Sequence, residues 1–297
     1  MNNVVKLIIS MAANLSGSLI KKQINIRYDN SIFSYQFYNC VVSLASAIVL
    51  LIMADNTSCS LFTIITAVIF GLITLIQQIT NLYALESGPL SYTSVLISLS
   101  SLIPTISGAI FWNEKIAAVQ YIGIALMTVS FLFSVSSDSE SKKTNKRWLF
   151  FCLTAFLCTG AIGVMQKFHQ TSAHKDELDS FLIIAFFVSF ILSGIHSLVL
   201  LKSSKKEAFS KTSSVIRLIP LALMLISGIF VAINNKFNLY LSGVMEAAIF
   251  FPTVNGGGLV LTSVFAYLIF KEKLTVKQWV GVIIGIIAVI LISNPFQ

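Results

Sequence analysis

The chain has 297 residues, of which 56% are hydrophobic and only 11% are charged. Soluble domains carry roughly a quarter charged residues, so this composition excludes a soluble globule and predicts an integral membrane protein in a lipid bilayer. The formal net charge of +8 comes without a basic patch interleaved with aromatic residues. We therefore expect lysines in cytoplasmic loops and no nucleic-acid partner.

Long apolar runs predict helices rather than strands. The run VGVIIGIIAVILI, for example, lacks the alternation of apolar and polar residues that a membrane β-barrel requires. A helix needs about 20 apolar residues to span the hydrocarbon, and the chain has room for ten such spans. The predicted spans cover residues 3–20, 32–53, 61–84, 89–112, 117–136, 148–168, 180–201, 215–238, 244–270 and 275–293.

The distribution of basic residues predicts the orientation of the spans. Fifteen of the 20 Lys and Arg residues fall in connectors that follow odd-numbered spans, and five fall elsewhere. Cytoplasmic loops carry the excess of Lys and Arg, so those connectors should be cytoplasmic and both termini extracytoplasmic. This assignment depends on an even number of spans.

The chain also contains an internal repeat. Residues 77–133 and 234–291 share an amide-rich segment, a Leu-Tyr pair, a long apolar run, a Glu-Lys turn and a final apolar run with glycine. We predict five-helix repeats at 1–136 and 148–297, separated by a polar cytoplasmic linker at 137–147. Because each repeat has an odd number of spans, the second enters the bilayer from the opposite side, which makes the repeat inverted.

Amides recur within the membrane at matched positions of the two repeats. The candidates in the third and eighth spans, each followed by a tyrosine at the same spacing, are Gln77, Gln78, Asn81, Tyr83, Asn234, Asn235, Asn238 and Tyr240. Their spacing places each amide set on one helix face. The two faces would line one central substrate site, since polar groups in hydrocarbon favour a wet cavity. The alternative is that these amides form hydrogen bonds between helices.

Three further positions are candidate substrate contacts. Asn14 and Asn255 are single polar residues in apolar surroundings, and Asn255 follows Pro252, which loosens a helix. Close helix packing is the alternative for Asn255. Glu246 lies just inside the predicted ninth span, where it would hold a cation or carry a proton, or instead be a first-turn carboxylate favoured by the helix dipole.

The remaining charged and titratable residues predict structural roles. Lys167 is expected to extend toward the membrane surface, and Glu114 to set a helix hairpin. His169 should lie in a solvated connector, and His196 should be an interior residue with satisfied hydrogen bonds. The sequence has no catalytic centre, no metal-ligand spacing and no cofactor motif, so we do not expect an enzyme.

The repeat resembles the drug/metabolite transporter superfamily and, within it, the EamA-like proteins. The resemblance is carried by IFWNEKIAAVQYIGIALMTVSFLF and LIFKEKLTVKQWVGVIIGIIAVILI, and by the basic endings GSLIKK and GVMQKF. It implies ten helices around a substrate cavity and transport by alternating access. Asn113 and Lys271 stand where the family often has glycine before Glu, and the first span lacks the acid that short multidrug relatives use for proton coupling.

The leading hypothesis is a secondary transporter of a small polar metabolite, such as an amino acid, in a bacterial-type cytoplasmic membrane. Neutral amides favour an uncharged or zwitterionic substrate. The alternatives are a flippase or exporter of amphiphilic or lipid-linked compounds or drugs, and a membrane scaffold that transports nothing. The sequence does not identify a coupling ion.

Overall fold

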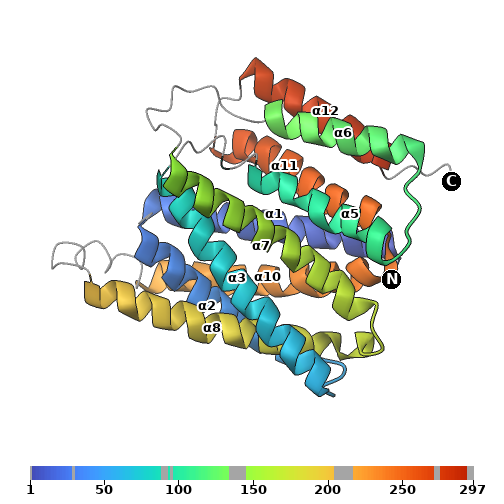
Figure 1. The fold of residues 1–297 in the computed structure, drawn as a ribbon. Helices are drawn as coiled ribbons and strands as arrows, with labels where there is room; N and C mark the ends of the chain where they lie inside the picture. Colours follow the sequence, from blue (N-terminus) through green and yellow to red (C-terminus); the bar gives the residue numbers. More distant parts are fainter. Residues whose placement is uncertain are drawn as a thin grey trace. The chain divides into compact units, whose positions relative to one another are not determined.

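The computed structural model describes residues 2–28, 31–87, 93, 96–133, 145–203, 217–270 and 275–292, and all regular structure in them is helical (Figure 1). The α-helices of these segments are α1 (Asn3–Arg27), α2 (Ile32–Ile52), α3 (Leu61–Ser87), α5 (Leu102–Phe111), α6 (Ala118–Phe133), α7 (Lys146–Gln170), α8 (Leu178–Ser203), α10 (Leu218–Val244), α11 (Ala247–Phe270) and α12 (Val276–Ile292). Two short 3₁₀ helices, η1 (Leu99–Ser101) and η2 (Lys175–Glu177), precede α5 and α8. The all-helical prediction is confirmed for these residues.

Seven of the helices described are long and apolar enough to cross a membrane. The other three apolar helices, Leu96–Phe111, α6 and α12, are 10 to 17 residues long. The ten-span count therefore stays a prediction. The predicted linker at 137–147 lies mostly outside the described residues, and α7 begins within it at Lys146.

Several helices begin where a polar side chain satisfies the first backbone N–H groups. The Asn2 side chain accepts a hydrogen bond from the Val4 amide at 3.3 Å, and Ser31 accepts one from the Ser34 amide at 3.2 Å. Asn145 Oδ1 accepts from the Trp148 amide at 2.7 Å. These caps fix the starts of α1, α2 and α7.

The chain divides into two compact units that do not coincide with the predicted repeats. Unit 1 comprises Met1–Leu75 and His169–Tyr240, and unit 2 comprises Ile76–Phe168 and Leu241–Gln297. The helices α3, α7 and α10 contribute residues to both units. The repeat boundaries remain a prediction.

In unit 1, α2 packs along α8, and α1 and α2 both contact α10. Tyr38 and Ser227 share a hydrogen bond of 2.5 Å between α2 and α10, and Ser46 Oγ donates to the Gly228 carbonyl at 2.9 Å. A methyl group at Gly71 of α3 would lie 2.8 Å from the Val188 side chain, so glycine allows α3 to approach α8. Small and hydroxyl residues thus bring the helices close together.

Polar contacts gather at one end of unit 1. The Asp55 amide donates to Asp179 Oδ2 at 3.0 Å, and Lys236 pairs with Asp179 at 2.8 Å. His169 is fully buried at the end of α7, where its Nε2 lies 3.1 Å from Thr63 Oγ1. The predicted solvated position of His169 is wrong, because this hydrogen bond with α3 satisfies the ring in the interior.

In unit 2, α6 packs against α12 and α5 against α11, as Figure 1 also shows. Ser130 Oγ donates to the Gly281 carbonyl at 2.7 Å, and Met127, Phe131, Ala288 and Ile292 form a buried cluster between α6 and α12. The two Gly-bearing spans that end the sequence repeats are therefore direct neighbours.

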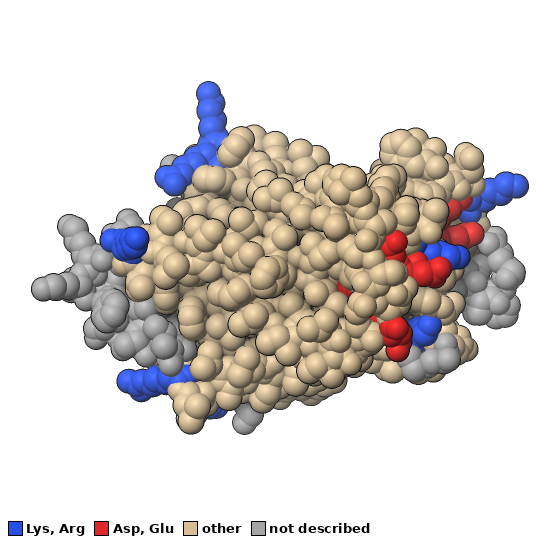
Figure 2. All heavy atoms as spheres, turned by 90° about the horizontal axis from the view of Figure 1, so that it is seen from below, with Lys and Arg blue, Asp and Glu red and all other residues tan. Residues whose placement is uncertain are grey.

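On the face drawn in Figure 2, most of the visible atoms belong to residues other than Lys, Arg, Asp and Glu. Many large apolar side chains of the described helices are exposed, among them Leu61, Ile110 and Phe150. Such exposure is unfavourable in water and expected against lipid.

Candidate functional site

The predicted amide faces lie on helices of equal length. Both α3 and α10 have 27 residues, and Gln77 and Asn234 lie at the same distance from their first residues. The same holds for Tyr83 and Tyr240. Because the α3 amides belong to unit 2 and the α10 amides to unit 1, the meeting of the two faces stays a prediction.

On α10, two of the three amides are joined to α1 by Ser10. The Ser10 hydroxyl lies 2.6 Å from Asn238 Oδ1 and 2.9 Å from Asn234 Oδ1, and Asn238 Nδ2 donates to Asn234 Oδ1 at 3.2 Å. A hydroxyl has one proton, so it serves one amide oxygen at a time. Ser10 is fully buried. Sequence analysis missed this residue because a serine in an apolar helix gives no signal of its partner.

The other two α10 positions are also engaged within unit 1. Asn235 Nδ2 donates to the Val231 carbonyl of the preceding turn at 2.9 Å. The ammonium group of Lys6 lies 3.4 Å from the centre of the Tyr240 ring, a cation–π contact between α1 and α10. All three amides are half-buried, so they retain access to a ligand.

On α3, the amides are less completely bonded. Gln77, Gln78 and Asn81 are half-buried, and the buried oxygen Oε1 of Gln78 has no hydrogen-bond partner among the described residues. The Tyr83 ring stacks on Phe151 of α7 with centroids 5.3 Å apart. Gln78 therefore carries a buried acceptor whose hydrogen bond is unmet among the described residues.

Asn14 and Asn255 have different surroundings. Asn14 is half-buried on α1. Asn255 is exposed, and it is the sole exposed position in the fully described stretch 247–260 of α11. Pro252 lies within the helix one turn earlier, and the hydroxyl of the buried residue Thr253 has no hydrogen-bond partner in the described part of the chain. The Asn255 side chain is thus not enclosed by the described residues around it, and its role as a substrate contact stays a prediction.

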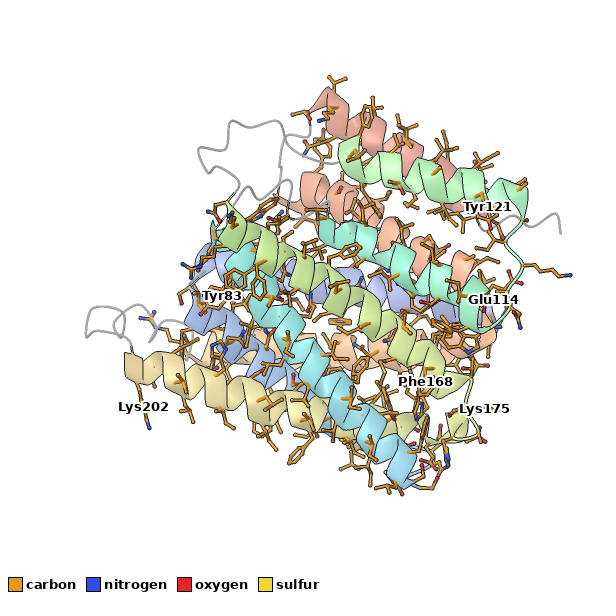
Figure 3. The ribbon with its side chains drawn as sticks, in the orientation of Figure 1. Tyr83, Glu114, Tyr121, Phe168, Lys175 and Lys202 are labelled. Carbon is orange, nitrogen blue, oxygen red and sulfur yellow. The ribbon has the colours of Figure 1, made fainter. Side chains whose placement is uncertain are left out.

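Glu246 lies outside the helix that was predicted to contain it. Because α11 begins at Ala247, Glu246 occupies the exposed connection from α10. The carboxylate at the start of α11 belongs to Glu114 instead, whose Oε2 accepts a hydrogen bond from the Ala247 amide at 2.7 Å. Figure 3 labels Glu114 just beyond the end of α5.

Lys167 pairs with this carboxylate. Its ammonium group contacts Glu114 Oε1 and donates to the carbonyls of Met245 at 3.1 Å and Ser242 at 3.4 Å. The Lys167 side chain is 3% exposed, so its predicted extension to the membrane surface is wrong. An unpaired buried ammonium would be costly, and the carboxylate and two carbonyls offset that cost.

The turn after α5 presents Glu114 through an unusual backbone. Asn113 has φ +51°, and the Glu114 amide donates to the Gly108 carbonyl at 3.3 Å. A methyl group at Gly108 would lie 2.6 Å from Ala247 Cβ, so glycine is required for this approach of α5 to α11. The Glu272 turn of the second repeat lies outside the described residues.

Three comparisons with known proteins bear on identity. The sequence profile of the EamA-like transporter family matches residues 146–294, which is half of the chain. The chain belongs to the EamA-like transporter family. No curated protein matches this EamA-like chain.

Solved structures share the fold of this EamA-like protein. Twenty-eight chains match, and one titled only "Crystal structure of protein" has a TM-score of 0.75 at 8% sequence identity, over 97% of this chain and 95% of that chain. At such low identity the likeness concerns the fold alone. Family membership and the apolar helices together make this chain a multi-pass membrane transporter.

Proposed function

We propose that this EamA-like protein is a secondary-active transporter that moves a small polar metabolite, such as an amino acid or a related compound, by alternating access. The family match supports transport, and the amides support the substrate class. The observation that carries the proposal is the recurrence of the amide set at equal depth in α3 and α10. Helix packing alone does not require matched amides in both repeats.

The chemistry of these groups favours an uncharged or zwitterionic substrate. The free Gln78 oxygen accepts hydrogen bonds, and the exposed Asn255 amide both donates and accepts them. Lys167, a cation that would attract an anionic substrate, is neutralised by Glu114. Tyr83 and Tyr240, with Asn14 on α1, would shape the cavity.

The proposed transporter lies in a bacterial-type cytoplasmic membrane with both termini outside. Within unit 1, α2 runs antiparallel to α8, so the end of α1 at Arg27 lies level with the end of α8 at Lys202. Figure 3 labels Lys202 at the end of α8 and Lys175 just before its start, in η2. Acidic residues, including Asp55 and Asp179, lie at the other end from Lys202 and Arg27. This separation of charge supports cytoplasmic placement of Arg27 and Lys202.

We also propose that the halves 1–136 and 148–297 are inverted five-helix repeats joined by the linker at 137–147. The equal lengths of α3 and α10 and the match of the family profile to residues 146–294 support it.

Transport into membrane vesicles tests the proposal. A screen of radiolabelled neutral and zwitterionic amino acids should find one whose uptake or efflux depends on this protein and falls when Gln78 or Asn235 is replaced by Ala. Normal transport by both variants would remove the amide site, and transport of lipid-linked compounds alone would replace the substrate class.

A further inference from the structure

A second set of polar groups, outside the amide faces, lies on α2 and α8 in unit 1. Its three members are buried and carry atoms that no described residue hydrogen-bonds: Gln36 Nε2 and Oε1, Asn39 Nδ2 and Ser193 Oγ. Gln36 and Ser193 are fully buried, and Asn39 is 7% exposed. We call these three residues the α2–α8 seam. The half-buried His196 lies outside this set, and the expectation that it has satisfied hydrogen bonds is wrong at Nδ1, which has no partner among the described residues.

The register of the two helices brings these residues to one level. A methyl group at Gly194 would lie 3.4 Å from Cys40 Sγ, and Asp55 is hydrogen-bonded to Asp179. The two helices are therefore antiparallel, so residues nearer the start of α2 lie level with residues nearer the end of α8. In this register Gln36, Asn39 and Ser193 fall within two turns of each other.

Such a concentration of unmet hydrogen bonds needs an explanation. A buried polar group without a partner costs roughly 1–3 kcal/mol, and a membrane interior supplies no solvent to relieve it. Other hydroxyl groups of the same helices have partners: Ser46 Oγ donates to the Gly228 carbonyl, and Ser197 Oγ donates to the Ser193 carbonyl. The unmet atoms of Gln36, Asn39 and Ser193 contrast with these satisfied neighbours.

The donors and acceptors of the seam define what fits it. The amide nitrogens of Gln36 and Asn39 donate, Gln36 Oε1 accepts, and the Ser193 hydroxyl does both. Neither α2 nor the part of α8 at this level has a carboxylate. A cation would meet amide donors without a counter-charge, and an anion would meet no positive side chain from these three residues. A neutral group that both donates and accepts hydrogen bonds matches the set.

We propose that the α2–α8 seam is a hydrated site that binds neutral hydrogen-bonding groups, either water molecules or the hydroxyl or amide group of a solute. Buried water typically makes about three hydrogen bonds to polar groups that would otherwise be unsatisfied. This site is separate from the proposed amide site on α3 and α10, and it does not depend on the transport activity.

Replacing Gln36 by leucine distinguishes a hydrated seam from a dry one, because the two cases change Tm in opposite directions. If the seam is dry, Gln36→Leu removes two unsatisfied atoms and raises Tm. If the seam holds water or solute, the substitution removes real hydrogen bonds and lowers Tm by about 2–4 °C. Ser193→Ala should change Tm in the same direction with a smaller change of side-chain volume, and it replaces Gln36→Leu if that variant does not fold.

Gln120→Leu is the matched control. Gln120 is 4% exposed, and its Oε1 accepts a direct hydrogen bond from the Ala117 amide at 2.8 Å, so its replacement should lower Tm. We expect both seam variants to lower Tm in the same direction as this control. An unchanged or raised Tm in Gln36→Leu and Ser193→Ala would overturn the proposal.

Acetamide and glycerol at millimolar concentration separate the two occupants. If either probe raises the Tm of the wild-type protein more than that of Gln36→Leu, the seam accepts a solute. If both proteins respond equally while the seam variants still lose stability, the occupant is water. Because the readout is thermal unfolding in detergent, the result is independent of whether the α3 and α10 amides carry substrate.

Discussion

The ammonium group of Lys167 and the carboxylate of Glu114 form a buried ion pair in unit 2, with side chains 3% and 13% exposed. The lysine reaches carbonyls at the end of α10, and the glutamate reaches the first amide of α11. Helix ends leave backbone groups without intrahelical partners. One ion pair therefore stabilises both sides of the break between α10 and α11.

Removing one member of this pair should be costly. We expect Glu114→Ala or Lys167→Met to lower the free energy of unfolding by roughly 3–5 kcal/mol, because each leaves an uncompensated buried charge. Denaturant titration in detergent measures the loss. The double variant should lose less than the two single losses combined, and additive losses would contradict the pairing. Lys115→Ala, an exposed position in the same turn, is the control and should change stability by about 0.5 kcal/mol or less.

The amide site predicts a loss of transport without a loss of folding. Gln78→Ala and Asn235→Ala should each reduce substrate-dependent flux in vesicles by about tenfold, which corresponds to about 1.4 kcal/mol of lost substrate interaction. Thr74→Val, one turn earlier on α3, removes a hydroxyl bonded to the Phe70 carbonyl and should leave flux unchanged. Equal flux in all three variants would rule out the amide site.

The Ser10 contact should contribute to stability. Ser10→Ala removes the hydroxyl that bonds the Asn234 and Asn238 oxygens, and we expect Tm to fall by about 2 °C. The matched control is Ser16→Ala on the same helix, whose hydroxyl bonds only its own helix at the Ala12 carbonyl. A larger effect at Ser16 than at Ser10 would argue against a helix-joining role for Ser10.

Cys59 reports the orientation of the chain. This exposed thiol lies in the connection between α2 and α3, which is expected outside the cell. A membrane-impermeant maleimide should label it on intact cells, whereas Lys202→Cys in a Cys59→Ser background should label only after permeabilisation. The reverse pattern would invert the topology.

The pH dependence of this labelling has a defined sign. Partial burial, reinforced by the Glu177 carboxylate, raises the pKa of the Cys59 thiol. The thiolate is the reactive form, so a raised pKa lowers its fraction at neutral pH and the labelling rate should rise as the pH is raised toward that pKa. Glu177→Gln should increase the rate of Cys59 labelling at neutral pH, which is measured by quenching the maleimide reaction at successive times. A slower rate in that variant would contradict the electrostatic effect of Glu177.

Sequence patterns predicted the helices well because hydropathy is a local property. A continuous apolar run determines that a segment is helical without reference to its neighbours, so α2, α3 and α8 lie close to their predicted bounds. The Glu246 position differs by only a few residues, yet that difference moves its carboxylate out of the helix.

Partners between helices could not be predicted in the same way. The contact of Ser10 with Asn238, or of Lys167 with Glu114, depends on the rotation and crossing of helices that are distant in sequence. The same holds for Gln36, whose unmet hydrogen bonds become visible only when the face of α8 opposite it is known. Single polar residues in apolar helices therefore carry no pattern from which their role follows.

Because the Lys167–Glu114 ion pair is buried, its strength should depend little on ionic strength. Mobile ions weaken interactions between charges that face solvent and hardly reach those enclosed by protein. The connection between α10 and α11 should therefore keep its geometry at both low and high salt concentration. The Lys236–Asp55 contact, whose carboxylate is 97% exposed, should loosen as salt is added.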